Sequence, residues 1–170
     1  MKEYQKLYRL VTAALFAAAI AVMTAYMLHI PIPTGGYIHI GDALIYLAAC
    51  LLPLPYAVGA AAVGAGLADL LTAPMWMPAT VVIKSLVVLP FTSRRTRILC
   101  PRNIAAIFIS GLISPVGYGL AACVLLGGPS AFLPQFLGTL IQAAASGAVF
   151  VVLALALDGA RVKERLSAGI

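Results

Sequence analysis

Long apolar runs, separated by short polar or proline-rich breaks, make up most of this sequence. The runs cover residues 8–28, 42–52, 56–73, 77–91, 104–126 and 133–157. A helix that crosses the hydrocarbon core of a bilayer needs about 20 largely apolar residues. The pattern therefore predicts an all-α integral membrane protein, with six transmembrane helices in a single domain over residues 1–170 and no soluble domain.

The second run is too short to cross a bilayer as a helix of its own. Eleven residues of helix extend about 16 Å, roughly half of the hydrocarbon thickness. Either this helix begins earlier, near Tyr37, or the preceding segment 29–41 folds back into the protein. That segment is rich in proline, glycine and histidine, which makes it a candidate cap over a pocket.

Composition supports the membrane interpretation and excludes other classes. The chain is 63% hydrophobic and 9% charged, with a mean hydropathy of +1.06. Soluble domains are about 45–50% apolar and about 25% charged. Residues 103–157 contain no Asp, Glu, Lys or Arg. A soluble enzyme, a nucleic-acid-binding protein and a disordered tail are all excluded.

The positions of the basic residues predict the orientation. Ten of the eleven Lys and Arg residues lie at the two ends of the chain or between the fourth and fifth runs. Loops rich in Lys and Arg stay on the cytoplasmic side. With six spans, all ten would be cytoplasmic, as would both termini. The eleventh, Lys84, lies within a span.

Away from the cytoplasmic ends, three charged residues lie within or beside the predicted spans: Asp42, Asp69 and Lys84. Each costs about 2.5–3.5 kcal/mol at the centre of a span, so each needs an explanation. Asp42 stands at a helix start, where it could cap the helix or bind a ligand. Asp69 and Lys84 lie on consecutive antiparallel helices and are expected to form an ion pair, either structural or facing a ligand cavity.

Several uncharged residues are also candidates for function. Tyr37 and Trp76 lie near the outer boundary, as interfacial anchors or as stacking faces for an aromatic ligand. Tyr118 and Gln142 lie in the uncharged region, where a hydroxyl or amide needs a partner from a neighbouring helix or a substrate. Residues Ala13, Ala17 and Ala21 repeat at four-residue spacing, which allows close helix contact within the chain or with another subunit.

Catalytic and metal-binding motifs are missing from the sequence. There is no GxSxG, no HExxH and no glycine-rich phosphate loop, so an ATPase is excluded in this chain. The three cysteines form no CxxC or Cys/His spacing, and a metal site or disulfide framework is not expected.

Three stretches together resemble the S components of energy-coupling factor (ECF) transporters. They are GYIHIGDALIYLAA at 36–49, ADLL at 68–71 and TVVIK at 80–84. The pattern is closest to the riboflavin- or hydroxymethylpyrimidine-type branch, and with the six spans the resemblance covers essentially the whole chain. Relatives in this branch often carry an acidic residue after the Gly-Tyr of the fifth helix; here Gly117-Tyr118-Gly119 has none. We therefore expect a neutral or anionic ligand.

The resemblance implies an S-component-like helix bundle in a prokaryotic plasma membrane that captures a vitamin or vitamin precursor, a small heterocycle, from outside. A separate scaffold subunit and two ATP-binding subunits would use ATP, and this chain would need no cofactor. The scaffold would dock on Ala13, Ala17 and Ala21. The expected substrate-binding residues are Tyr37, His39, Asp42, Asp69, Trp76, Lys84, Tyr118 and Gln142.

Two other functions remain open at this point. A stand-alone proton-coupled carrier could use Asp69 and Lys84 as a proton relay. An intramembrane enzyme would have to draw on His39, Asp42, Asp69 and Lys84, which are the acid–base groups available.

Overall fold

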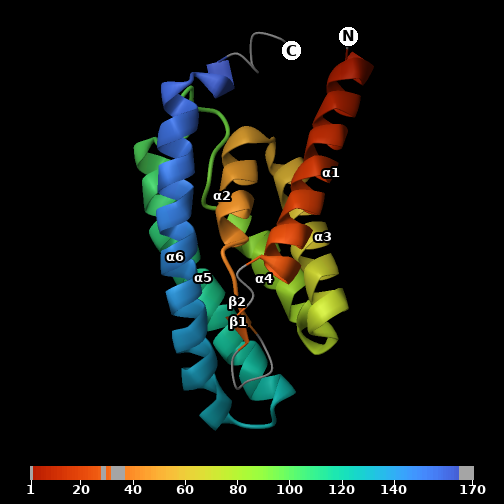
Figure 1. Cartoon of the computed structure of the whole chain (residues 1–170), viewed down its shortest axis with the longest axis vertical. Helices are drawn as coiled ribbons and strands as arrows, with labels where there is room; N and C mark the ends of the chain where they lie inside the picture. The colour runs from red at the N-terminus through yellow and green to blue at the C-terminus, as the bar shows by residue number, and fades with distance from the viewer. Residues whose placement is uncertain (1, 28–29, 32–36, 165–170) are drawn as a thin grey trace.

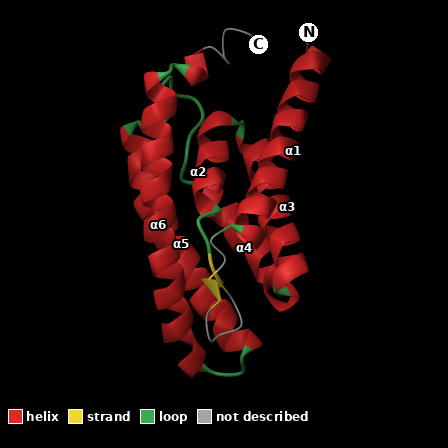
Figure 2. Cartoon of the chain, viewed as in Figure 1, coloured by secondary structure: helices red, strands yellow, loops and turns green. Residues whose placement is uncertain are grey.

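The computed structural model describes residues 2–27, 30–31 and 37–164, and within them the chain forms six α-helices and a small hairpin (Figures 1 and 2). In chain order the elements are α1 (Lys2–Tyr26), β1 (Ile30–Pro31), β2 (Tyr37–Ile38), α2 (Asp42–Leu51), α3 (Leu54–Thr72), the 3-10 turn η1 (Pro74–Trp76), α4 (Met77–Val88), α5 (Pro101–Leu125), the 3-10 turn η2 (Pro129–Ala131) and α6 (Phe132–Gly159).

Among the described residues, four helical segments are long and apolar enough to cross a membrane: Glu3–Tyr26, Leu54–Thr72, Pro101–Leu125 and Pro129–Gly159. The chain is thus an all-α membrane protein. The helices α2 and α4 are shorter, with 10 and 12 residues. Proline ends α2, because the residue before a proline is disfavoured in the helical conformation, and Leu52, which precedes Pro53, is extended. Helix α4 ends just before Leu89 and Pro90, although Leu89 itself keeps a helical conformation.

The two ends of the bundle differ in charge. The start of α1, the loop between α4 and α5 and the end of α6 lie at one end of the molecule, and the hairpin and η2 lie toward the other (Figure 1). The first end, here called the basic end, carries the arginines of loop 89–100 together with Arg161 and Lys163. The opposite end is here called the hairpin end.

The hairpin decides between the two expectations for segment 29–41. Ile30–Pro31 pairs antiparallel with Tyr37–Ile38, and α2 begins at Asp42. The expectation that this helix starts near Tyr37 is therefore wrong, and the chain folds back as extended backbone. Residues 28–29 and 32–36, which complete the expected cap, lie outside the described residues.

Close packing of α1 on α3 uses the small residues that we had expected to bind a scaffold subunit. Ala13 and Ala21 are buried within the chain. A Cβ atom at Gly64 of α3 would lie only 2.6 Å from the carbonyl oxygen of Ala17, so the two backbones are in direct contact. The docking assignment of Ala13, Ala17 and Ala21 is thus corrected: small side chains here let two helices of the same chain approach.

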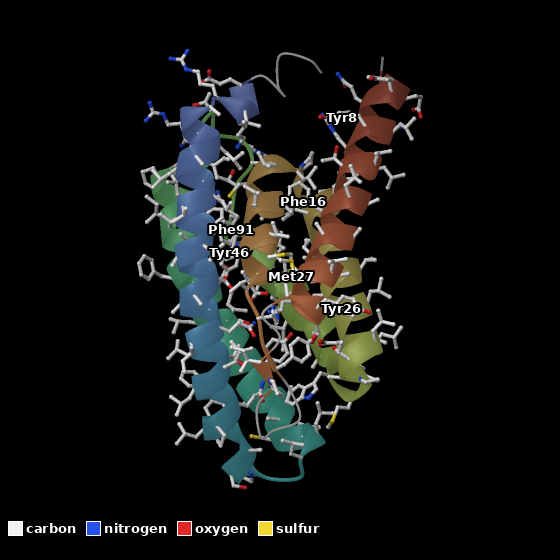
Figure 3. The ribbon with its side chains drawn as sticks, in the orientation of Figure 1. Tyr8, Phe16, Tyr26, Met27, Tyr46 and Phe91 are labelled. Atoms are coloured by element: carbon white, nitrogen blue, oxygen red, sulfur yellow. The ribbon has the colours of Figure 1, made fainter. Side chains whose placement is uncertain are left out.

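An aromatic cluster fills the interior between the hairpin end and the basic end. The ring of Tyr46 in α2 stacks on Phe91 at 5.0 Å and meets Phe150 of α6 edge-on at 5.8 Å. Figure 3 shows Tyr46 and Phe91 side by side at mid-height of the bundle.

Candidate ligand-binding site

A small polar cavity of about 30 Å³ lies at the hairpin end of the interior. Five elements supply its wall: the hairpin with its following loop, α3, η1, α5 and α6. Its lining residues are Tyr37, His39, Asp69, Trp76, Tyr118, Gln135, Thr139 and Gln142. Six of the eight residues expected to bind a substrate are therefore gathered around one space. The other two, Asp42 and Lys84, do not line it.

Asp69, in the last turn of α3, is the charged residue of the cavity wall. Its carboxylate accepts hydrogen bonds from the Tyr37 hydroxyl and from the Thr80 hydroxyl of α4. The Thr80 hydroxyl also lies 2.7 Å from the Tyr118 hydroxyl. Because Thr80 gives its single proton to Asp69, Tyr118 is the donor in that second contact. The result is a directed chain of hydrogen bonds that ends on the Asp69 carboxylate.

Tyr37 links this chain to the hairpin. Burial, reinforced by the neighbouring Asp69 carboxylate, raises the pKa of Tyr37 above its ordinary value. The hydroxyl therefore keeps its proton at neutral pH and remains a donor to Asp69. This contact ties the hairpin to α3 at the mouth of the cavity.

Lys84 pairs with Asp42 and not with Asp69, which corrects the expected ion pair. The Lys84 amine lies 2.7 Å from one carboxylate oxygen of Asp42 and 2.8 Å from the other. The two side chains are 1% and 0% exposed, so each charge is neutralised by its partner. The same amine lies 5.1 Å from the centre of the Tyr118 ring. The pair therefore sits directly behind the cavity wall.

Asp42 also receives a hydrogen bond from α6. The side-chain amide of Gln142 donates to Asp42 at 3.1 Å, and its carbonyl oxygen accepts from the backbone N–H of His39 at 3.4 Å. The helix cap expected for Asp42 is not formed by its side chain, since Gly41 occupies the cap position without a side-chain hydrogen bond. Gln142 thus connects the ion pair, the hairpin and the cavity.

His39 has one ring nitrogen engaged locally. Its Nδ1 accepts a hydrogen bond from the backbone N–H of Gly41 at 3.0 Å. A neutral imidazole that accepts at Nδ1 carries its proton at Nε2. On the cavity wall, the His39 ring is accordingly a hydrogen-bond donor through Nε2.

Trp76 lies inside the molecule, where the sequence had left an interfacial anchor as one alternative. Its side chain is 2% exposed, and its ring centre lies 6.0 Å from that of Tyr118. Among the described residues, its indole N–H is buried without a hydrogen-bond acceptor. An unsatisfied buried donor costs about 1–3 kcal/mol. A ligand with an acceptor in the cavity would recover that free energy.

Sequence reasoning missed three residues of the site. Gln135 and Thr139 precede Gln142 on α6 and are joined to each other by a hydrogen bond of 3.4 Å. Together with Gln142 and Ser146, these two residues form a buried polar stripe along α6, with successive spacings of four, three and four residues. That helical periodicity in an uncharged region was a readable signal. Thr80 lies one turn before Lys84 and orients Asp69.

The match to known families is now informative. Residues 5–158 match the family described as ECF-type riboflavin transporter, S component. The chain belongs to this family. As a family member it is a substrate-binding subunit for vitamin uptake, and the family is a class of transporter subunits and not of enzymes.

One curated relative is similar over most of its length. It is a Pyrococcus woesei protein described as "Uncharacterized protein in gap 3'region", 32% identical over 124 residues that cover 71% of this chain and 82% of the relative. Its description names no ligand, so the chemistry of the cavity must indicate the substrate.

Proposed function

We propose that this S component captures a small, planar vitamin-type heterocycle in the hairpin-end cavity and delivers it inward with an ECF module. The observation that carries the proposal is Trp76, which lines this cavity and whose buried indole N–H has no acceptor among the described residues. Ligand pockets combine apolar and aromatic walls with a few placed polar groups. Here Trp76, Tyr118 and Tyr37 supply the rings, and the two glutamines supply amides.

The charges of the cavity favour a ligand that is not anionic. Asp69 is the charged group on the wall, and Lys84, which could have attracted an anion, is neutralised by Asp42. This revises the expectation of a neutral or anionic ligand. The preferred ligand has an acceptor for Trp76 and an N–H donor for Asp69, as in a pyrimidine or flavin ring. The cavity in this structure has a volume of about 30 Å³, room for a water and not for a heterocycle, so the residues around it would have to move apart when a ligand binds.

We further propose six spans with both termini in the cytoplasm. The basic residues of the chain ends and of loop 89–100 gather at one end of the bundle (Figure 1), and such clusters stay inside. The short helices α2 and α4 would be completed across the bilayer by the hairpin and by loop 89–100. The cavity then opens toward the outside, where a substrate arrives.

The partners proposed for transport are an ECF scaffold subunit and two ATP-binding subunits, which bind and hydrolyse the ATP. The packing of α1 leaves Ala14 and Ala18 exposed. These alanines offer a smooth surface for a scaffold helix, in place of the buried set that we first expected.

Uptake measured with and without the ECF module tests this proposal. Cells that express the chain with the module should accumulate labelled riboflavin or hydroxymethylpyrimidine, whereas cells with the chain alone should bind without accumulating. Accumulation by the chain alone, abolished by a protonophore, would instead indicate the stand-alone proton-coupled carrier.

A further inference from the structure

An apolar groove separate from the cavity described above runs along α5 and α6. It has a volume of about 600 Å³ and is lined by residues that include Leu99, Ile107, Phe108, Gly111, Ala144 and Gly147. The floor is tight, since a Cβ at Gly147 would lie 3.0 Å from Ile107. The surface is open, because a Cβ at Gly111 would meet no atom within 4 Å. Both helices are long enough to span a membrane, so the groove faces lipid.

The groove continues into a polar pocket at the basic end. The backbone N–H of Leu99, a groove residue, donates to the Asp158 carboxylate at 2.9 Å. Asp158 also lines a pocket of about 270 Å³, together with Thr96, Arg97, Arg161, Lys163 and Glu164. The hydrogen bond between Leu99 and Asp158 therefore links the apolar groove to the polar pocket.

The charges in this pocket favour an anion. Asp158 is already satisfied by the backbone N–H groups of Ile98 and Leu99, and Lys163 donates to the Cys50 carbonyl oxygen at 2.7 Å. Arg97 and Arg161 are both exposed, with Glu164 as the remaining acidic neighbour. Guanidinium groups bind phosphate through paired hydrogen bonds, which makes these two arginines suited to a phosphate headgroup.

We propose that an anionic phospholipid binds here, with an acyl chain in the α5–α6 groove and its phosphate at Arg97 and Arg161. A free phosphate ion would leave the apolar groove empty, and an apolar partner helix would leave the two arginines without a binding partner from the ligand. Basic pockets at the ends of transmembrane helices recognise anionic headgroups. The site is independent of whatever ligand occupies the hairpin-end cavity.

Native mass spectrometry of the full chain in detergent tests the headgroup half of the site. The probes are phosphatidylglycerol and phosphatidylcholine with identical acyl chains. The wild-type chain should retain phosphatidylglycerol preferentially. The double substitution Arg97→Gln and Arg161→Gln should lower that preference about tenfold, on the scale expected for two basic residues at a membrane surface. Arg95→Gln, an exposed arginine of the same loop that does not line the pocket, is the matched control and should change nothing.

Two neighbouring alanines test the groove half. Ala144 lines the groove and Ala145 does not, although both are exposed. Ala144→Leu should reduce retention of phosphatidylglycerol at least threefold, and Ala145→Leu should not. If the double arginine variant does not fold, a salt titration of the wild-type chain takes its place. The preference for phosphatidylglycerol must then fall as the NaCl concentration rises, because screening weakens exposed charge pairs.

Several results would overturn the proposal. They are equal retention of the two lipids by the wild-type chain, a preference unchanged by the double arginine substitution, and a preference insensitive to salt. Loss of scaffold binding in Ala144→Leu with lipid retention unchanged would assign the groove to a protein partner and equally refute the lipid site.

Discussion

Lys84 of α4 lies 2.7 Å from Asp42 at the start of α2, and this buried pair joins three helices, since Gln142 of α6 donates to the same carboxylate. The pair leaves Asp69, the other buried acid, to the hydroxyls of Tyr37 and Thr80. The two buried carboxylates therefore differ in their surroundings: Asp42 is paired with Lys84 behind the cavity wall, and Asp69 lies on the wall.

Removing Lys84 should destabilise the fold. Lys84→Met leaves the Asp42 carboxylate buried and unpaired, which costs about 3–5 kcal/mol. The thermal midpoint can be followed with a thiol-reactive dye, because Cys50 and Cys100 are buried in the folded chain. Lys84→Met should give a clearly lower midpoint than the wild type.

The second-site change identifies the partner of Lys84. Adding Asp42→Asn to Lys84→Met removes the orphaned charge and should restore most of the lost stability. Adding Asp69→Asn instead should not restore it. Rescue by Asp69→Asn and not by Asp42→Asn would mean that Lys84 pairs with Asp69 in the membrane.

Two adjacent alanines of α1 separate internal packing from docking. Ala17 contacts Gly64 through its backbone, and Ala18 is exposed. Ala17→Leu should crowd the α1–α3 contact and lower stability by about 1–3 kcal/mol. Ala18→Leu should leave the isolated chain intact and weaken co-purification with an ECF module. If Ala18→Leu assembled normally, the scaffold would have to dock elsewhere.

Membrane orientation can be tested with single cysteines in a cysteine-free background. Ser130 at the hairpin end and Arg95 at the basic end are both exposed. In intact cells, Ser130→Cys should react with an impermeant maleimide and Arg95→Cys should react only after the membrane is permeabilised. The reverse labelling would invert the proposed topology.

The sequence was sufficient for the helices and for most of the residues around the cavity. Apolar runs mark helices because apolar side chains must face lipid or one another, and Pro53 marks the end of α2. Asp69, Trp76 and Gln142 stood out because a polar or aromatic side chain in such a region needs a partner. These are local properties of single positions, and they can be read without knowing which helices are neighbours.

Pairwise contacts could not be predicted in the same way. Lys84 was assigned to Asp69 because those two residues lie on consecutive helices. The bundle also brings the start of α2 against α4, and Lys84 forms its ion pair with Asp42. The alanine stripe of α1 suits any close helix, and only the fold shows that α3 already occupies it. Both errors arose because sequence spacing fixes the face of a helix but not its neighbour.

The most direct test of the ligand site uses Trp76, the single tryptophan of the chain. Its fluorescence in the purified protein, titrated with riboflavin and with hydroxymethylpyrimidine alongside calorimetry, reports on the cavity wall itself. We predict saturable quenching by at least one compound, with affinity lowered at least tenfold (about 1.4 kcal/mol) by Gln142→Ala and unchanged by Val124→Ala, a substitution on the exposed surface. Binding of neither compound, or calorimetric binding that leaves the Trp76 fluorescence unchanged, would contradict a vitamin-type ligand in this cavity.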